Sequence, residues 1–397
     1  MDKNKETSIP LAVYVLGLGI FSMTTSEFMV SGLMPELISQ FGVSFAAIGF
    51  LITAYAAAMT IGGPLLTVGL LKIPRKTALL MLVGVFCVGQ ALGAVSNTYE
   101  VMLVTRVITG VAASAFFGVS LAVCVEIVGP QLRGRASSIV LGGLMVGTVI
   151  GLPAATLISQ SSGWRISFWA VAVLALVVGL ITLWAVPASP KPAAVSLRAE
   201  LTAFRNGRLW AAFATSMLII GATFAAFTYF TPILIQLSGF SLATLPWLLV
   251  VYGIATVIGN NVVGRLADRY TIPVLAVGLL SLILVLTAFA LFAEYRVPTV
   301  AALVALGLVG VTMNPAMATR VMRTSNDRPL VNTVHTAVIT LGIVIGSWAG
   351  GVVIDAGYGL TSPLWVGAVL AVLGFLTLLP DLAQLRARAR VPVEVGT

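Results

Sequence analysis

The sequence predicts an all-α membrane protein with twelve transmembrane helices in two six-helix bundles. Its 397 residues are 59% hydrophobic and only 9% charged, with a mean hydropathy of +1.08, whereas soluble globular domains are roughly 25% charged. Apolar runs of about 20 residues, the length that crosses the hydrocarbon core of a bilayer, recur along the whole chain. One long basic loop near the middle divides these runs six and six.

The first six runs are separated by short segments that carry most of the charges of this half. The first run follows Lys3 and Lys5 as the core of a signal sequence would. It is too long for that role, lacks a cleavage site of small residues and precedes further spans, so we expect it to be retained. The predicted spans are Pro10 to Leu33, Phe45 to Leu70, Ala78 to Val95, Val101 to Val125, Ser137 to Ile158 and Ile166 to Val186.

The second six runs follow the central loop and meet the same length criterion. The predicted spans are Leu209 to Thr231, Leu245 to Val263, Pro273 to Ala293, Thr299 to Thr319, Val331 to Ile354 and Pro363 to Leu379.

The basic residues predict which side each loop faces, because cytoplasmic loops of membrane proteins are rich in Lys and Arg. With both termini placed inside, all 22 bases except Arg106, Arg165 and Arg296 fall in cytoplasmic segments. We therefore expect a multi-pass protein of a bacterial inner membrane with both termini in the cytoplasm. The net charge of +9 then reports topology, and we expect no nucleic-acid partner.

The two halves show weak internal similarity. A shift of the chain that superposes Tyr55 on Tyr252 also superposes Gly62 on Gly259 and Lys72 on Arg269, and transporters are often built from such repeats. We expect an N-terminal bundle over residues 1–187, a cytoplasmic linker over 188–208, and a C-terminal bundle with a short basic tail over 209–397.

Glu27 and Arg106 are the two charges that fall deep inside predicted spans, and we expect buried charge only in the first half. Such a group costs on the order of 3 kcal/mol or more unless it is paired or hydrated. Counted from Leu33 and Val101, the two residues lie about 9 Å and about 7 to 8 Å below the outer face. They could therefore pair or share a water-filled cavity.

The chemistry of the two side chains suggests different roles. Arginine keeps its proton under ordinary conditions, whereas a carboxylate in a cavity can bind and release one. We predict Glu27 as the proton carrier and Arg106 as the fixed charge that biases it. The alternatives are an ion pair that only fixes helix packing and, for Arg106, a side chain that reaches the membrane interface.

Aromatic and amide side chains in the spans suit a small amphipathic or neutral solute, which they can hold by apolar contact and a few hydrogen bonds. The alternative is that these side chains face lipid or neighbouring helices. The candidate substrate-binding residues are Tyr55, Phe224, Phe227, Tyr229, Tyr252, Asn260, Asn261 and Asn314.

Other chemistry has little support. His335 is the only histidine and is either a proton relay or a hydrogen-bonded packing residue. Cys87 and Cys124 fall inside predicted spans, where we expect them to pack. No phosphate-binding loop or metal-ligand spacing is present, so we expect no cofactor, no metal site and no enzymatic activity.

Three motifs resemble those of the major facilitator superfamily. The segment after the eighth span reads Gly264-Arg265-Leu266-Ala267-Asp268-Arg269, similar to the loop signature in which the glycine lets helices approach and the charges form a network. Its first-half counterpart has Leu71 where the family has an acid. Arg106 followed by Gly110 resembles a motif associated with proton coupling in antiporters of the superfamily.

Two further elements resemble the drug/proton antiporter branch. Span five carries Gly143, Gly147, Gly151 and Pro153, although Leu152 separates the Gly-Pro pair that the family has adjacent. Span one carries Thr25-Ser26-Glu27-Phe28. The branch includes actinobacterial chloramphenicol exporters and permeases that export sugars and purine ribonucleosides.

The resemblance implies proton-coupled export of small organic compounds, with a chloramphenicol-like drug as the expected cargo. The alternatives are a sugar or nucleoside exporter and a membrane sensor that transports nothing. The expected partners are a small-molecule substrate, protons and the lipid bilayer, and we expect a monomer. The network of Gly264, Arg265, Asp268 and Arg269 and the span-five glycines are expected to serve gating.

Overall fold

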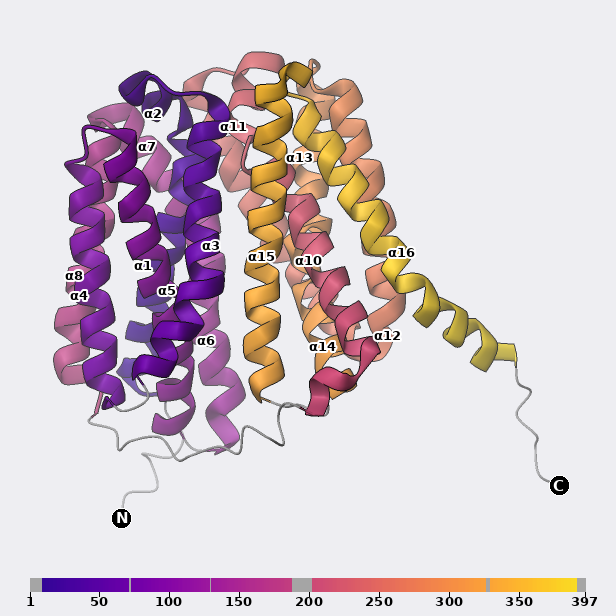
Figure 1. Cartoon of the computed structure of the whole chain (residues 1–397), viewed down its shortest axis with the longest axis horizontal. Coiled ribbons are helices and arrows are strands. Elements are labelled where there is room, and N and C mark those ends of the chain that lie inside the picture. Colours follow the sequence, from indigo (N-terminus) through magenta and orange to yellow (C-terminus); the bar gives the residue numbers. More distant parts are fainter. Residues whose placement is uncertain (1–8, 71–72, 129, 188–201, 326–328, 391–397) are drawn as a thin grey trace.

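The computed structural model describes residues 9–70, 73–128, 130–187, 202–325 and 329–390. Within them, twelve helical segments are long and apolar enough to cross a membrane (Figure 1). The predicted all-α class with twelve spans in two bundles is confirmed. Residues 188–201 of the predicted linker lie outside the described residues, and so does the side chain of Asp268.

The first bundle occupies the left of Figure 1. One of its spans is built from three consecutive helical pieces, α6, η3 and α7, and a short helix, α2, lies at the end of α1. The elements are α1 (Leu11–Gly32), α2 (Met34–Phe41), α3 (Phe45–Leu70), α4 (Arg75–Ala94), α5 (Tyr99–Ile127), η2 (Pro130–Leu132), α6 (Arg133–Val146), η3 (Gly147–Gly151), α7 (Leu152–Ser162) and α8 (Trp164–Ala185).

The second bundle repeats this plan with a broken span of its own, α13, η7 and α14. Its elements are η4 (Thr202–Arg205), α10 (Gly207–Phe227), α11 (Phe230–Pro232), η5 (Ile233–Leu237), η6 (Leu242–Thr244), α12 (Leu245–Phe292), α13 (Arg296–Val309), η7 (Val311–Met313), α14 (Asn314–Ser325), α15 (Pro329–Val353), η8 (Ile354–Tyr358) and α16 (Ser362–Arg390).

Prolines explain two irregular places. η3 is a π-helical turn in which Leu152 N–H binds the carbonyl of Gly147, five residues back. Pro153 follows it and has no N–H to continue the ordinary ladder. In α12 the eighth and ninth spans join without a loop, and Tyr270 alone has a non-helical backbone (φ −124°, ψ 38°) three residues before Pro273. The loop expected after span eight is thus reduced to a kink at Tyr270, and the signature residues Gly264 to Arg269 are helical.

The bundles meet mainly through α3 against α15 and through α12 against η3 and α7. We call the face at which α1 begins and α16 ends the inner face, which the charge distribution predicts to be cytoplasmic, and the opposite face the outer face. Near the outer face, Thr231 Oγ1 donates to Ser31 O at 2.5 Å and Gln160 Nε2 donates to Leu242 O at 2.7 Å. These cross-bundle bonds hold the outer ends of the bundles together.

Candidate functional site

A buried polar cluster lies in the outer half of the first bundle, where α1, α3, α4 and α5 converge. Its members are Ser26, Glu27, Tyr55, Gln90 and Arg106, all at most 6% exposed. Their helices are otherwise apolar, so the polar groups of the cluster have mainly one another and the α1 backbone as partners.

Arg106 binds the backbone of α1. Its Nη1 donates to Ser26 O at 2.9 Å and to Ser26 Oγ at 3.1 Å, and its Nη2 donates to Glu27 O at 3.1 Å. The guanidinium also lies 4.2 Å from the centroid of the Tyr55 ring, a cation–π contact. The planar guanidinium thus fixes the position of α1 along the axis of α5.

The carboxylate of Glu27 forms no ion pair within 4.0 Å among the described residues. Of the two arrangements expected from the sequence, the direct ion pair is therefore not formed. Arg106 instead contacts Glu27 at its backbone carbonyl group. The positive charge still acts on the carboxylate through space. A carboxylate with no basic partner keeps both oxygens available for a proton.

Gln90 belongs to the cluster, and the sequence reasoning missed it. Its Nε2 donates to Ser26 Oγ, while its Oε1 and the Nε of Arg106 are buried with no hydrogen-bond partner among the described residues. Buried polar groups usually have hydrogen-bond partners. The Gln90 Oε1 can therefore accept a hydrogen bond from a molecule that enters the cluster, and the Arg106 Nε can donate one. The signal in the sequence was a single amide inside an otherwise apolar span.

Aromatic side chains of both bundles meet at Phe28, the residue that follows Glu27 on α1. Phe28 on α1 packs against Phe224 and Phe227 of α10, with ring centroids 5.5 Å apart in each case. Tyr252 on α12 extends this group through Phe227 at 5.4 Å and Phe230 at 5.3 Å. The structure thus brings together three of the predicted substrate-binding residues and adds Phe28 and Phe230.

Tyr229, by contrast, packs between the two bundles. Its hydroxyl donates to Ser347 O at 2.9 Å, and a Cβ atom added to Gly49 or to Gly351 would overlap that hydroxyl. Because Gly49 lies on α3 and Gly351 on α15, the two glycines make room for the Tyr229 side chain between the bundles. Tyr229 is therefore packed at the outer closure and is not joined to the aromatic group at Phe28.

The three asparagines are also apart from the cluster. Asn260 is half-buried on α12, two turns further toward the inner face than Tyr252. Asn261 is exposed and its amide donates to the carbonyl of Val257 on its own helix at 2.8 Å. Asn314 is exposed at the start of α14. No contact among the described residues gathers them with the aromatic side chains.

The span-five glycines pack directly on α1. A Cβ atom added to Gly143 would meet Gly17 O, one on Gly147 would meet Thr24, and one on Gly151 would meet Thr25. This arrangement fits a close-packing face of small residues. It brings η3 and Pro153 of α7 against the helix that carries Glu27.

The signature after span eight shows a different environment. Nothing lies within 4 Å of a Cβ atom added to Gly264, so the close helix approach expected there is not found. Arg265 is exposed, and the guanidinium of Arg269 lies 5.2 Å from the Tyr270 ring centroid.

Two buried charged or titratable side chains in the second bundle are structural. His335 is 5% exposed, hydrogen-bonds through Nε2 to Ser216 Oγ at 2.9 Å, and stacks on Phe213, which favours the packing interpretation. Arg320 is 6% exposed and pairs with Asp381 at 2.7 Å. The expectation that buried charge is confined to the first half is therefore wrong, because the buried Arg320, whose partner Asp381 is partly exposed, lies near the inner end of α14.

No group of three or more His, Cys, Asp or Glu side chains suited to a metal ion occurs among the described residues.

Comparison with known proteins connects this geometry to a family. The sequence model described as Major Facilitator Superfamily matches residues 16–326 and 239–391. A chloramphenicol resistance protein of Streptomyces lividans is 32% identical over 377 residues, which cover 94% of this chain and 96% of that protein. The inner membrane transport protein YdhP of Escherichia coli (strain K12) is 31% identical over 362 residues, covering 91% and 93%.

The fold also matches solved transporters. A bacterial homologue of the human lysosomal transporter Spinster, in an inward-facing and unoccupied conformation, superposes with a TM-score of 0.73. The match covers 95% of this chain and 97% of that one at 16% identity. At this identity the likeness concerns the fold alone.

Proposed function

This chain belongs to the major facilitator superfamily, and from that premise we propose that it exports small organic compounds in exchange for protons, with a chloramphenicol-like drug as cargo. It is a multi-pass membrane transporter related to bacterial inner membrane proteins. The observation that carries the proposal is the buried carboxylate of Glu27, which has no ion-pair partner among the described residues. The next residue of α1, Phe28, packs against an aromatic wall formed by Phe224, Phe227 and Tyr252.

Glu27 is the proton carrier in this proposal. It is the only acidic side chain that is buried among the described residues. Arg106 is bound to carbonyl groups of α1, so its charge stays in place whether Glu27 is protonated or not. A fixed positive charge favours the ionised carboxylate, which promotes release of the proton to the inner side.

The aromatic wall indicates the class of cargo. Phe28, Phe224, Phe227 and Tyr252 offer mostly apolar ring surface, which suits a small neutral molecule with an aromatic ring better than a sugar. The chloramphenicol resistance protein of Streptomyces lividans, similar over nearly the full length, supports the same choice. We propose that a solute against this wall competes with the protonated carboxyl of Glu27, which precedes Phe28 on α1.

The transport cycle follows from this competition. Protonated Glu27 and bound solute exclude one another, and rocking of the two bundles exposes the site to each side in turn. The bonds from Thr231 to Ser31 and from Gln160 to Leu242 break when the outer ends separate. We propose that a single chain performs this cycle, with both termini in the cytoplasm and the signature of Gly264, Arg265, Asp268 and Arg269 biasing the two states.

The test is proton movement driven by solute in proteoliposomes that contain a pH-sensitive dye. Chloramphenicol, arabinose and inosine are added in turn to the purified protein and to Glu27→Gln. We expect chloramphenicol to cause a pH change that the variant lacks. A response to arabinose or inosine alone would favour the metabolite exporter, and a solute flux without any pH change would refute proton coupling.

A further inference from the structure

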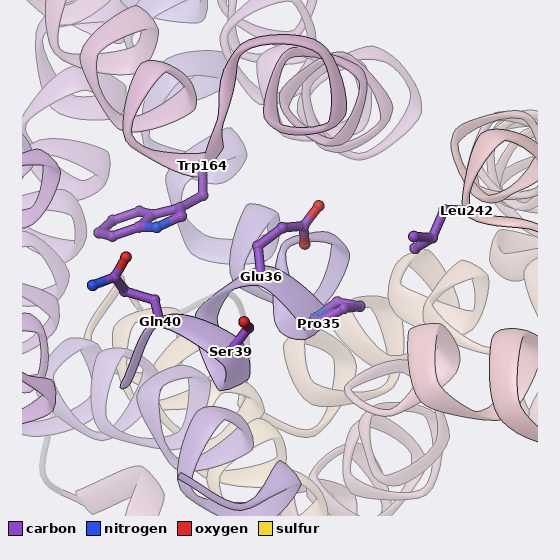
Figure 2. Close-up of a pocket in the computed structure, with 6 residues that line it drawn as sticks. All are labelled: Pro35, Glu36, Ser39, Gln40, Trp164 and Leu242. Atoms are coloured by element: carbon purple, nitrogen blue, oxygen red, sulfur yellow. The ribbon is translucent and has the colours of Figure 1, made fainter. Parts of the chain in front are cut away.

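A cavity of about 500 Å³ opens on the outer face between the two bundles (Figure 2). Its walls come from α2, the start of α8 and η6 of the second bundle, and its volume falls within the usual range for small-molecule sites. The lining residues are Pro35, Glu36, Ser39, Gln40, Trp164 and Leu242. None of them belongs to the polar cluster around Glu27.

Glu36 supplies the only charge among these lining residues. Figure 2 shows its carboxylate extending from α2 into the space between Trp164 and Leu242. The Oε2 atom is shielded from solvent and has no well-formed hydrogen bond among the described residues. Burial raises the pKa of the Glu36 carboxyl, and the Ser159 hydroxyl and the Glu36 backbone offset this effect only in part, because the loss of solvent around the charge outweighs these contacts.

The basic side chain next to the cavity is engaged elsewhere. The guanidinium of Arg165 lies 4.4 Å from the centroid of the Trp164 ring. It donates to Gln40 Oε1, Ser96 O and Asn97 Oδ1, each at 3.1 Å. Glu36 forms no ion pair within 4.0 Å among the described residues. The cavity thus presents a partly desolvated negative charge beside an indole ring and the apolar side chains of Pro35 and Leu242.

We propose that this outer cavity binds an organic cation, an ammonium group on a small aromatic or alkyl body, with Glu36 as its counter-charge. The ammonium takes the place opposite the carboxylate, and the apolar body lies against Trp164 and Leu242. Because the walls belong to both bundles, a bound cation stabilises the arrangement in which the outer ends are closed. The proposal is independent of the exported solute and of proton coupling.

The test is calorimetric binding to the full-length protein in phosphatidylcholine nanodiscs at pH 8. The probes are 2-phenylethylammonium and its neutral counterpart 2-phenylethanol. We expect saturable binding of the ammonium only. Glu36→Gln should weaken it about tenfold, equivalent to about 1.4 kcal/mol, whereas Glu100→Gln, which removes an exposed outer carboxylate outside the cavity, should leave it unchanged.

Leu242→Trp provides a second test that leaves Glu36 in place. Its side chain is 45% exposed, so a larger ring can enter the cavity without disturbing the core, and the ammonium should bind at least about tenfold more weakly. Equal binding of amine and alcohol, absence of saturable binding, or unchanged affinity in Glu36→Gln or Leu242→Trp would overturn the proposal.

Discussion

Under the proposed mechanism, Glu27 sets an upper limit on the solute gradient that the transporter can build. It is the only buried acidic side chain among the described residues, and one carboxylate carries one proton per cycle. At zero membrane potential, a pH difference of one unit supplies about 1.4 kcal/mol per proton. For a neutral cargo this supports a concentration ratio of about tenfold, and Glu27→Gln is expected to support no accumulation at all.

The assay uses proteoliposomes with a lumen one pH unit more acidic than the medium, and potassium with valinomycin holds the membrane potential at zero. Labelled chloramphenicol is followed to its plateau. Glu27→Gln should elute like the wild type in size-exclusion chromatography, which reports a folded protein, and Glu100→Gln should reach the wild-type plateau. A plateau near hundredfold would require a second proton carrier, and accumulation by Glu27→Gln would refute the assignment.

Three further predictions concern packing and charge. Arg106→Lys keeps the charge but loses the guanidinium fork, so the free energy of unfolding should fall by about 1–3 kcal/mol in chemical denaturation; unchanged stability would contradict the backbone anchoring. Gly49→Val crowds the Tyr229 hydroxyl, so a thiol reagent should label Ser31→Cys faster, and adding Tyr229→Ala should reverse the effect. Because burial raises the pKa of Glu36, its ionised form opposes folding: Glu36→Gln should melt above wild type at pH 8, with no difference below about pH 4, and a difference that persists in acid would contradict this.

The membrane spans, and with them the fold class, could be predicted from the sequence because a span is recognised by the length and composition of its apolar run alone. The expected first span from Pro10 to Leu33 and the observed α1 (Leu11–Gly32) differ by one residue at each end. Glu27 and Arg106 were found by the same argument, since the cost of burying a charge is independent of which way the helix faces. Their common depth also follows from counting residues along a helix.

The directions of the side chains could not be predicted in this way. Hydropathy cannot distinguish a guanidinium aimed at a carboxylate from one aimed at the carbonyls of Ser26 and Glu27. It also cannot tell that Tyr229 fills a space left by glycines of two bundles, because that contact joins segments far apart in the chain. The form of the turn at Tyr270 was missed for a local reason. Charged and polar residues indicated a loop, whereas Tyr270 is the single residue of α12 whose backbone is not helical.

The distribution of the site over two bundles has a consequence for evolution. Glu27, Gln90 and Arg106 belong to the first bundle, whereas most rings of the aromatic wall, among them Phe224 and Tyr252, belong to the second. If the proposed site holds the cargo, we expect substitutions on α10 and α12 to alter cargo preference while the ionisable residues keep their surroundings. Laboratory selection for resistance to a new compound is then expected to enrich mutations on these two helices and to leave Glu27, Gln90 and Arg106 unchanged.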